Sequence, residues 1–106
     1  MGLFNLFNKA DINKGVEEYK KTPGAVLIDV RTAEEFEEGH IPQAVNIPLQ
    51  TIEETKEMYT IKDTPLFVYC RSGARSAQAA GYLEASGYTN IHDIGGIMNY
   101  TGQIEK

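Results

Sequence analysis

Apolar and polar positions divide the chain into short strand-like and helix-like segments that alternate along its length. Residues 25–30 and 66–69 are nearly continuous apolar runs, which is typical of strands buried on both faces. Residues 44–47 and 91–94 form two shorter runs of the same kind. Because strand and helix alternate, the sequence predicts an α/β fold with a mainly parallel sheet.

Capping residues and glycines mark the expected helix boundaries. Asp11 can cap a helix that reaches about Lys21, where the Thr-Pro-Gly sequence at 22–24 ends it. Residues 32–35 and 51–54 both match the capping box, so they predict short helices that end at Gly39 and near 58–59. A helix is expected over 77–86, ended by Gly87, and a short one after 95–96. The buried face of the first helix is expected to hold Ile12, Val16, Tyr19 and Gly15.

Length and charge narrow the class of protein. The 106 residues are expected to form a single domain over 1–106, with a loosely ordered segment at 1–10 and its apolar residues Leu3, Phe4, Leu6 and Phe7 folded onto the domain. The net charge is −5 with only three arginines, which argues against a nucleic-acid partner. No apolar run reaches the length of a membrane span, and the first residues lack the pattern of a secretory signal, so the expected location is cytoplasmic.

Cysteine and histidine usage argues against disulfide and metal chemistry. Cys70 is the single cysteine, so an internal disulfide is not possible. His40 and His92 lie far apart and show no metal-ligand spacing. We therefore expect neither a metal nor another cofactor.

Cys70 lies at the end of the apolar run 66–69 and opens the segment Cys-Arg-Ser-Gly-Ala-Arg-Ser at 70–76. Ligands of open parallel sheets bind at the carboxyl ends of strands, where a loop enters a helix. The backbone N–H groups of residues 71–76 can turn inward around an anion, because Gly73 tolerates positive φ. Amides, a helix N-terminus and the cations Arg71 and Arg75 all favour the thiolate, which is the reactive form of cysteine.

A structural role in the core is the alternative for Cys70. Lone cysteines at strand ends are usually small core residues. One glycine and two arginines within five positions are poor neighbours for a core residue, so the sequence favours a reactive Cys70.

Several segments in this order and spacing resemble the rhodanese family, specifically its small single-domain members. The resemblance extends from about residue 24 to residue 102. The matching segments are Leu-Ile-Asp-Val-Arg at 27–31, Glu-Phe at 35–36, Gly-His-Ile-Pro at 39–42, Ala-Val-Asn-Ile-Pro at 44–48, the segment 70–76, Gly-Tyr at 87–88 and Gly-Gly at 95–96. Two positions depart from the family pattern: Gln43 stands where a glycine is usual, and Ile97 stands where a large aromatic is usual.

The resemblance implies a rhodanese-like domain with a five-stranded parallel sheet and helices on both faces. It places the persulfide-carrying cysteine at Cys70 and the cradle around it at Cys70 through Arg75. Related families with one more residue between cysteine and arginine are phosphatases and arsenate reductases. Four residues separate Cys70 from Arg75 here, which is the sulfurtransferase length.

Other polar residues have plainer structural interpretations. Asp29 and Arg31 are expected to brace each other and the helix start at 34–35, and the resemblance also allows Asp29 a role in holding the Cys70 loop. His40 is expected to be a fixed structural imidazole and His92 a surface residue. Residues 34–38 are expected to be the solvated face of a helix with Phe36 turned inward, and a docking face for a basic partner is the alternative. Two roles are possible for the hydroxyl groups of Ser72 and Ser76: they can bind an anion or cap the next helix.

The expected function is a thiosulfate-type sulfurtransferase with Cys70 as nucleophile. A small anionic donor such as thiosulfate supplies the sulfur, and cyanide, a thiol or a thiol protein accepts it. The residues expected to bind the donor are Arg71, Ser72, Gly73, Ala74, Arg75 and Ser76. A persulfide carrier between protein partners is the first alternative. A Cys-dependent phosphatase or arsenate reductase on the same fold, and a binding module without chemistry, are the less favoured ones. The sequence leaves open the physiological donor and acceptor, the pathway and the oligomeric state.

Overall fold

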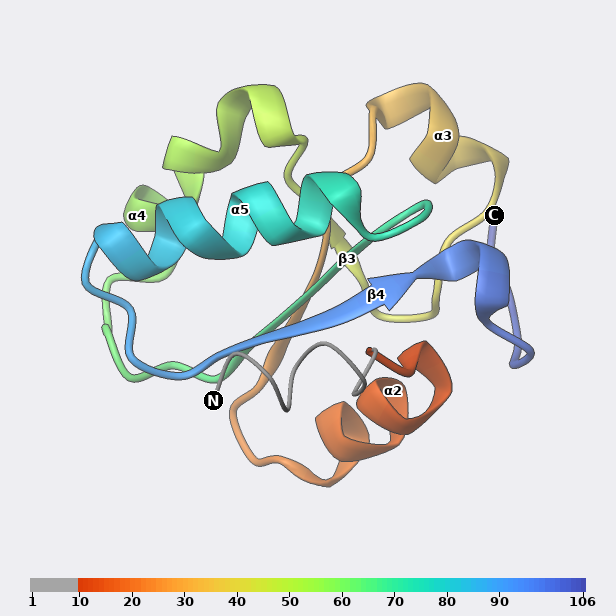
Figure 1. Ribbon diagram of the computed structural model, residues 1–106, viewed down its shortest axis with the longest axis horizontal. Coiled ribbons are helices and arrows are strands. Elements are labelled where there is room, and N and C mark those ends of the chain that lie inside the picture. The colour runs from red at the N-terminus through yellow and green to blue at the C-terminus, as the bar shows by residue number, and fades with distance from the viewer. Residues whose placement is uncertain (1–9) are drawn as a thin grey trace, which may run out of the picture.

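A sheet of four parallel strands in the order β2-β1-β3-β4 forms the centre of the computed structural model, which describes residues 10–106 (Figure 1). The strands are β1 (Val26–Asp29), β2 (Val45–Asn46), β3 (Leu66–Cys70) and β4 (Ile91–Gly96). Each strand falls on one of the four apolar runs, and β4 continues two residues beyond the predicted end. The α/β class and the parallel arrangement are confirmed.

The sheet has four strands in the part of the chain that the structure describes, so the five strands implied by the family resemblance are not found there. Ile12–Lys21 form the helix predicted for this part of the chain, and Asp11 caps its first turn by accepting hydrogen bonds from the N–H groups of Asn13 and Lys14. The one pairing outside the named strands in residues 10–106 is a single antiparallel bridge between His40 and Glu105.

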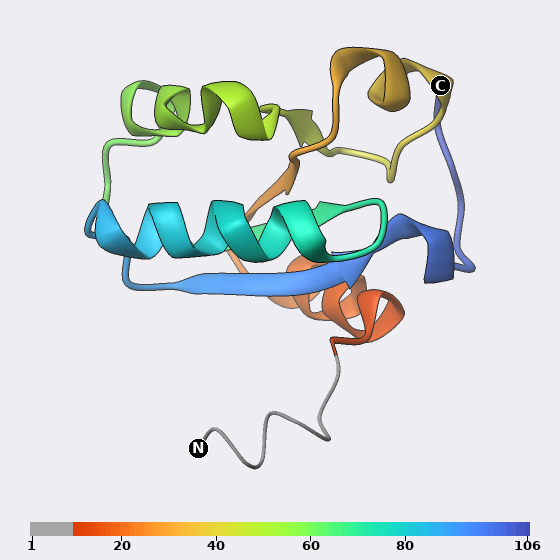
Figure 2. The same ribbon diagram turned by 45° about the horizontal axis from the view of Figure 1, so that its top comes forward.

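Helices cover both faces of the sheet, as expected. On one face lie α5 (Ala74–Ala85), the 3₁₀ helix η1 (Leu49–Glu54) and α4 (Thr55–Met58), and on the other lies α2 (Ile12–Lys21) (Figure 2). Each face has its own core cluster, with Leu83 and Val68 in the first and Val16 and Phe67 in the second. Ile12, Gly15 and Val16 of α2 are buried and Tyr19 is half-buried, which confirms the predicted face.

The two capping boxes predicted from the sequence have different outcomes. Thr32 and Glu35 form theirs at the start of α3 (Ala33–Glu38), and Gly39 ends that helix as predicted. The capping box expected at 51–54 is wrong, because a 3₁₀ helix already begins at Leu49, after Pro48. Thr51 lies at a kink within η1, with a non-helical backbone of φ −125 and ψ 31, and its hydroxyl donates to the carbonyl of Pro48 at 3.4 Å.

The connections at the ends of the chain complete the description. The short C-terminal helix is the 3₁₀ helix η2 (Ile97–Asn99), which follows β4 directly. The predictions made for residues 1–10 concern positions outside the described residues, with one exception. Ala10 is described, and it is exposed. In residues 10–106, every helix is too short or too polar to cross a membrane.

Candidate active site around Cys70

Cys70 is the last residue of β3, a strand in which all five residues are buried. The residue itself is 1% exposed. In the register of the sheet it lies opposite Gly96 of β4. A Cβ atom on Gly96 would overlap the carbonyl oxygen of Arg71 and lie 2.6 Å from the Cα of Ser72. Only glycine therefore lets β4 pack this closely under the loop that follows Cys70.

The chain turns sharply after Cys70. Gly73 has a left-handed backbone with φ 109, and this conformation directs its N–H group to the Cys70 Sγ at 3.0 Å. The N–H group of Met98, which follows β4, anchors the loop by donating to the Arg71 carbonyl at 3.1 Å.

Helix α5 begins at Ala74, three residues earlier than the predicted start at 77. Ala74 has a high helix propensity, and Gly73 serves as the N-cap without any side-chain cap. Arg75 and Ser76 therefore lie in the first turn of the helix and not in the loop. Since no side chain caps α5, the capping role considered for Ser72 and Ser76 is wrong.

Ser76 contacts the thiol directly. Its hydroxyl oxygen lies 3.6 Å from the Cys70 Sγ, whose S–H donates to it, and its own O–H donates to the carbonyl of Gly73 at 3.1 Å. Ser76 is fully buried. When the thiol loses its proton, the hydroxyl can rotate and donate to the thiolate instead. Ser72, by contrast, is exposed.

The hydrogen-bond donors around Cys70 lower the pKa of its thiol. Burial by itself raises the pKa of the Cys70 thiol, but hydrogen bonds from the Ser76 hydroxyl and from the amides of Ser76, Gly73 and Ser72 outweigh it. The net result is a pKa below the ordinary cysteine value. The arrangement favours a thiolate at the start of a helix, where the amide dipoles point toward it.

The two arginines of the 70–76 segment differ in their surroundings. Arg71 is exposed and, among residues 10–106, forms no ion pair. Arg75 pairs with Glu35 of α3 through two hydrogen bonds of 2.8 and 3.0 Å. The sequence predicts both arginines around the thiol. In the structure, Arg75 is paired with the Glu35 carboxylate.

Asp29 and Arg31 brace each other as expected. The Arg31 guanidinium donates to both carboxylate oxygens of Asp29, with a shortest distance of 2.7 Å, and both side chains are almost completely buried. Arg31 also donates to the carbonyl of Gly39 at 2.7 Å. It therefore holds the end of α3 and not the helix start at 34–35 that was expected.

The histidines are structural or exposed. The Nδ1 atom of His40 lies 2.8 Å from the carbonyl of Phe36, and the two rings are stacked with centroids 3.7 Å apart. This contact fixes His40 as predicted and leaves Phe36 half-buried. His92 is exposed and stacks on Phe67. No group of three His, Cys, Asp or Glu side chains suited to a metal occurs in residues 10–106.

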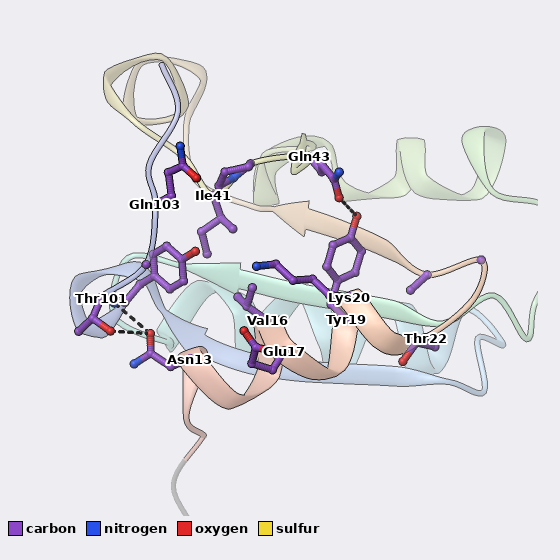
Figure 3. A pocket seen from close by; sticks show the side chains of 15 residues that line it. Asn13, Val16, Glu17, Tyr19, Lys20, Thr22, Ile41, Gln43, Thr101 and Gln103 are labelled. Atoms are coloured by element: carbon purple, nitrogen blue, oxygen red, sulfur yellow. Dashed lines mark hydrogen bonds between the residues drawn. The ribbon is translucent and has the colours of Figure 1, made fainter.

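A separate groove of about 670 Å³ lies on the α2 side of the sheet and includes no residue of the 70–76 segment (Figure 3). Val16 and Ile41 form part of its lining, and Tyr19 donates across it to the Oε1 atom of Gln43 at 3.3 Å. Gln43 has φ 76, a left-handed backbone that glycine adopts more easily. It is the one non-glycine residue with positive φ in residues 10–106.

Comparison with known proteins identifies the family. Residues 13–103 match the rhodanese-like domain. The chain belongs to the rhodanese family. It is 35% identical over 94 residues to a sulfurtransferase from Allochromatium vinosum, an alignment that covers 88% of this chain and 87% of that protein.

A solved structure of a rhodanese with anions from E. coli shares the fold. It superposes with a TM-score of 0.72 and 32% sequence identity, and the match covers 77% of this chain and 98% of that one. Other relatives are much longer. The chain is 33% identical over 103 residues to the adenylyltransferase and sulfurtransferase uba4 of Ogataea parapolymorpha but spans only 26% of its length. The rhodanese-like domain thus accounts for most of the chain.

Sequence reasoning missed three residues of this rhodanese fold that shape the site or its surroundings. Glu35 was recognised as a helix cap and as part of a segment that matches the family, but not as the partner of Arg75, which is forty positions away in the chain. The contact of Gly96 with the Cys70 loop had no local signal beyond the Gly-Gly pair. Gln43 was noted as a departure from the family pattern, but its backbone conformation was not.

Proposed function

We propose that this rhodanese domain transfers sulfane sulfur from thiosulfate, or a similar anionic donor, to a thiophilic acceptor through a persulfide on Cys70. The observation that carries this proposal is the Cys70 Sγ at the start of α5, with the Gly73 amide at 3.0 Å, the Ser76 hydroxyl at 3.6 Å and a lowered pKa. The anions in the E. coli rhodanese structure support an anionic donor.

The reaction takes place in two covalent steps. The Cys70 thiolate attacks the outer sulfur of thiosulfate, the S–S bond of the donor breaks, and sulfite leaves with the bonding electron pair. The amides of residues 72, 73 and 76 then stabilise the negative charge of the persulfide, as they stabilise the thiolate. An acceptor such as cyanide takes the outer sulfur and returns the thiolate. Atoms and charge balance in both steps without an external redox agent.

Initial-rate kinetics test this two-step mechanism. With thiosulfate and cyanide varied together, double-reciprocal plots are expected to be parallel, because sulfite leaves before the acceptor reacts. Lines that intersect would show that both substrates must be bound together, and they would contradict the persulfide mechanism. Cys70→Ser is expected to have no activity above background.

A persulfide carrier between protein partners is the second candidate, and the single cysteine of the chain is compatible both with it and with the small-molecule enzyme. With no second thiol to release the sulfur, an outside acceptor must take it. Single-turnover transfer from the Cys70 persulfide to cyanide and to a reduced thiol protein separates the two candidates. Faster transfer to cyanide supports the small-molecule enzyme, whereas much faster transfer to the thiol protein supports the carrier.

A further inference from the structure

The carboxylate of Glu35 links α3 to the first turn of α5. Its Oε1 atom accepts from the Arg75 guanidinium at 2.8 Å and from the Thr32 amide and hydroxyl, each at 3.1 Å. Its Oε2 atom accepts from the second guanidinium nitrogen of Arg75 at 3.0 Å. The Glu35 and Arg75 side chains are only 27% and 31% exposed, so solvent screens this two-pronged pair incompletely.

The same contacts shift the pKa values of both residues. The hydrogen bond from Arg75 is the main cause that lowers the pKa of Glu35 to about 2. Hydrogen bonding to Glu35, and to a smaller degree the charge of the nearby Cys70, raises the pKa of Arg75. Arg75 lies in the first turn of α5, the turn that also carries the Ser76 hydroxyl in contact with the thiol.

Within residues 10–106, two of the three arginines of the chain form ion pairs with carboxylates. Arg31 of the β1 end is paired with Asp29, and Arg75 of α5 is paired with Glu35 of α3. Arg71, next to the thiol in sequence, is the cation in this set without an acidic partner. A thiolate that approaches an anionic donor needs cationic charge to offset the repulsion, and more of it for a dianion than for a monoanion.

We propose that Glu35 is a specificity-determining residue: by pairing with Arg75 it leaves Arg71, which follows Cys70 in the chain, as the uncompensated cation of the 70–76 segment and adjusts the site to sulfur donors with a single negative charge. The favoured donor class is that of organic thiosulfonates and persulfides, which narrows the proposed function: thiosulfate remains a donor but is used less well than these monoanions. With a thiosulfonate, the Cys70 thiolate takes the sulfane sulfur, the bond between the two donor sulfurs breaks, and a sulfinate leaves with the electron pair. The donor preference rests on the proposed function, whereas the effect of Glu35 on the thiol does not.

Glu35→Gln is the variant that tests the donor preference. Glutamine keeps the capping box of α3, because either residue can accept from the Thr32 amide, and it removes only the charge that compensates Arg75. The control is Glu34→Gln, which removes the same charge from an exposed neighbouring position. KM is measured for thiosulfate and for benzenethiosulfonate with cyanide as acceptor.

We expect Glu35→Gln to lower the ratio of the thiosulfate KM to the benzenethiosulfonate KM by about three- to tenfold, because the freed Arg75 attracts the dianion more strongly. The control is expected to keep the wild-type ratio. An unchanged ratio in Glu35→Gln, or an equal change in both variants, would overturn the proposal.

A charge cycle on the thiol tests the same inference without any sulfur donor. The pKa of Cys70 is followed by the pH dependence of its alkylation with iodoacetamide. Glu35→Gln is expected to lower this pKa and Arg75→Gln to raise it, whereas the double variant returns it close to wild type. A residue with only a structural role would not produce opposite shifts that cancel. Identical profiles in all four proteins would overturn the proposal.

Protection from alkylation keeps the donor question testable even if the protein transfers no sulfur. Sulfate and methanesulfonate have similar shapes and differ in charge, and neither can donate sulfur. In Glu35→Gln, protection of Cys70 by sulfate relative to methanesulfonate is expected to increase. If protection shifts in this way but no persulfide forms, the proposed function fails and the charge inference stands. If persulfide forms but protection does not shift, the proposed function stands and the inference fails.

Discussion

Ser76 shows how much one hydroxyl can contribute to a reactive cysteine. It is completely buried, 3.6 Å from the Cys70 Sγ, and is the largest of the hydrogen-bonding contributions that lower the pKa of the thiol. Burial would otherwise hold the thiol in its neutral form. Reactivity at this position therefore depends on a side chain six residues away as well as on the loop amides.

Ser76→Ala is expected to raise the pKa of Cys70, because the thiolate loses its side-chain donor and keeps the cost of burial. Alkylation by iodoacetamide at neutral pH should become several-fold slower, and the pH profile should move upward. Ser86→Ala, at the other end of the same helix, is the control and should leave the profile where it is. A profile unchanged by Ser76→Ala would show that the amides alone stabilise the thiolate.

Gln43 is strained by its backbone conformation, with φ 76. Gln43→Gly and Gln43→Ala both lose the hydrogen bond from Tyr19, so a comparison between them isolates the backbone. We expect the glycine variant to be more stable than the alanine variant by about 1 kcal/mol in the free energy of unfolding, measured by urea denaturation. Equal stabilities would mean that this backbone conformation costs nothing.

At the scale of elements, the packing of β4 against the Cys70 loop positions the site. Gly96 has no room for a Cβ, because the Arg71 carbonyl and the Ser72 Cα occupy that space. The Met98 amide then anchors the loop from η2 through the Arg71 carbonyl. The loop is thus held between the end of one strand and the start of a 3₁₀ helix.

Gly96→Ala is expected to lower the free energy of unfolding by about 2 kcal/mol, since backbone atoms must shift to admit the methyl group. Gly81→Ala is the matched control, because nothing lies within 4 Å of the Cβ that it adds to α5. That control is expected to gain about 0.5 to 1 kcal/mol from its higher helix propensity. The two values come from urea denaturation, and the same sign for both would contradict this description of the packing.

The elements also show where sequence patterns succeed and fail. Each apolar run became one strand, since burial on both faces leaves a strong local signal. The same Thr-x-x-Glu pattern gave a capping box at 32–35 but not at 51–54. A 3₁₀ helix begins directly after Pro48 and is kinked at Thr51, whose hydroxyl donates back to the Pro48 carbonyl instead of capping a new helix. The pattern alone does not reveal an earlier start.

At the scale of the whole molecule, the charges that matter most are brought together from distant parts of the chain. Cys70 and its loop were predictable because strand, cysteine, glycine and helix follow one another in sequence. The pair between Glu35 and Arg75 was not, since it joins two helices and depends on how α3 sits beside α5. The sequence explains Glu35 as a helix cap and Arg75 as a cation of the Cys70 loop, and neither role indicates that the two side chains are in contact.

The stability of the whole molecule should depend on pH through Glu35, whose pKa is lowered from 4.5 to about 2. A lowered pKa in the folded state means stability that is fully present above the unfolded pKa and lost as the pH falls toward about 2. Glu35→Gln cannot lose this contribution. The stability difference between wild type and the variant should therefore shrink between about pH 6 and about pH 3 in urea denaturation. A constant difference would contradict the lowered pKa.

The persulfide on Cys70 is the central claim, and intact-mass spectrometry of the reduced protein before and after mixing with thiosulfate tests it most directly. We expect the protein to gain the mass of one sulfur atom, to lose it again on addition of cyanide, and to show no gain in Cys70→Ser. If Cys70 stays free and open to alkylation while thiosulfate and a thiosulfonate both leave the mass unchanged, the thiolate does not take up sulfur and the account is contradicted.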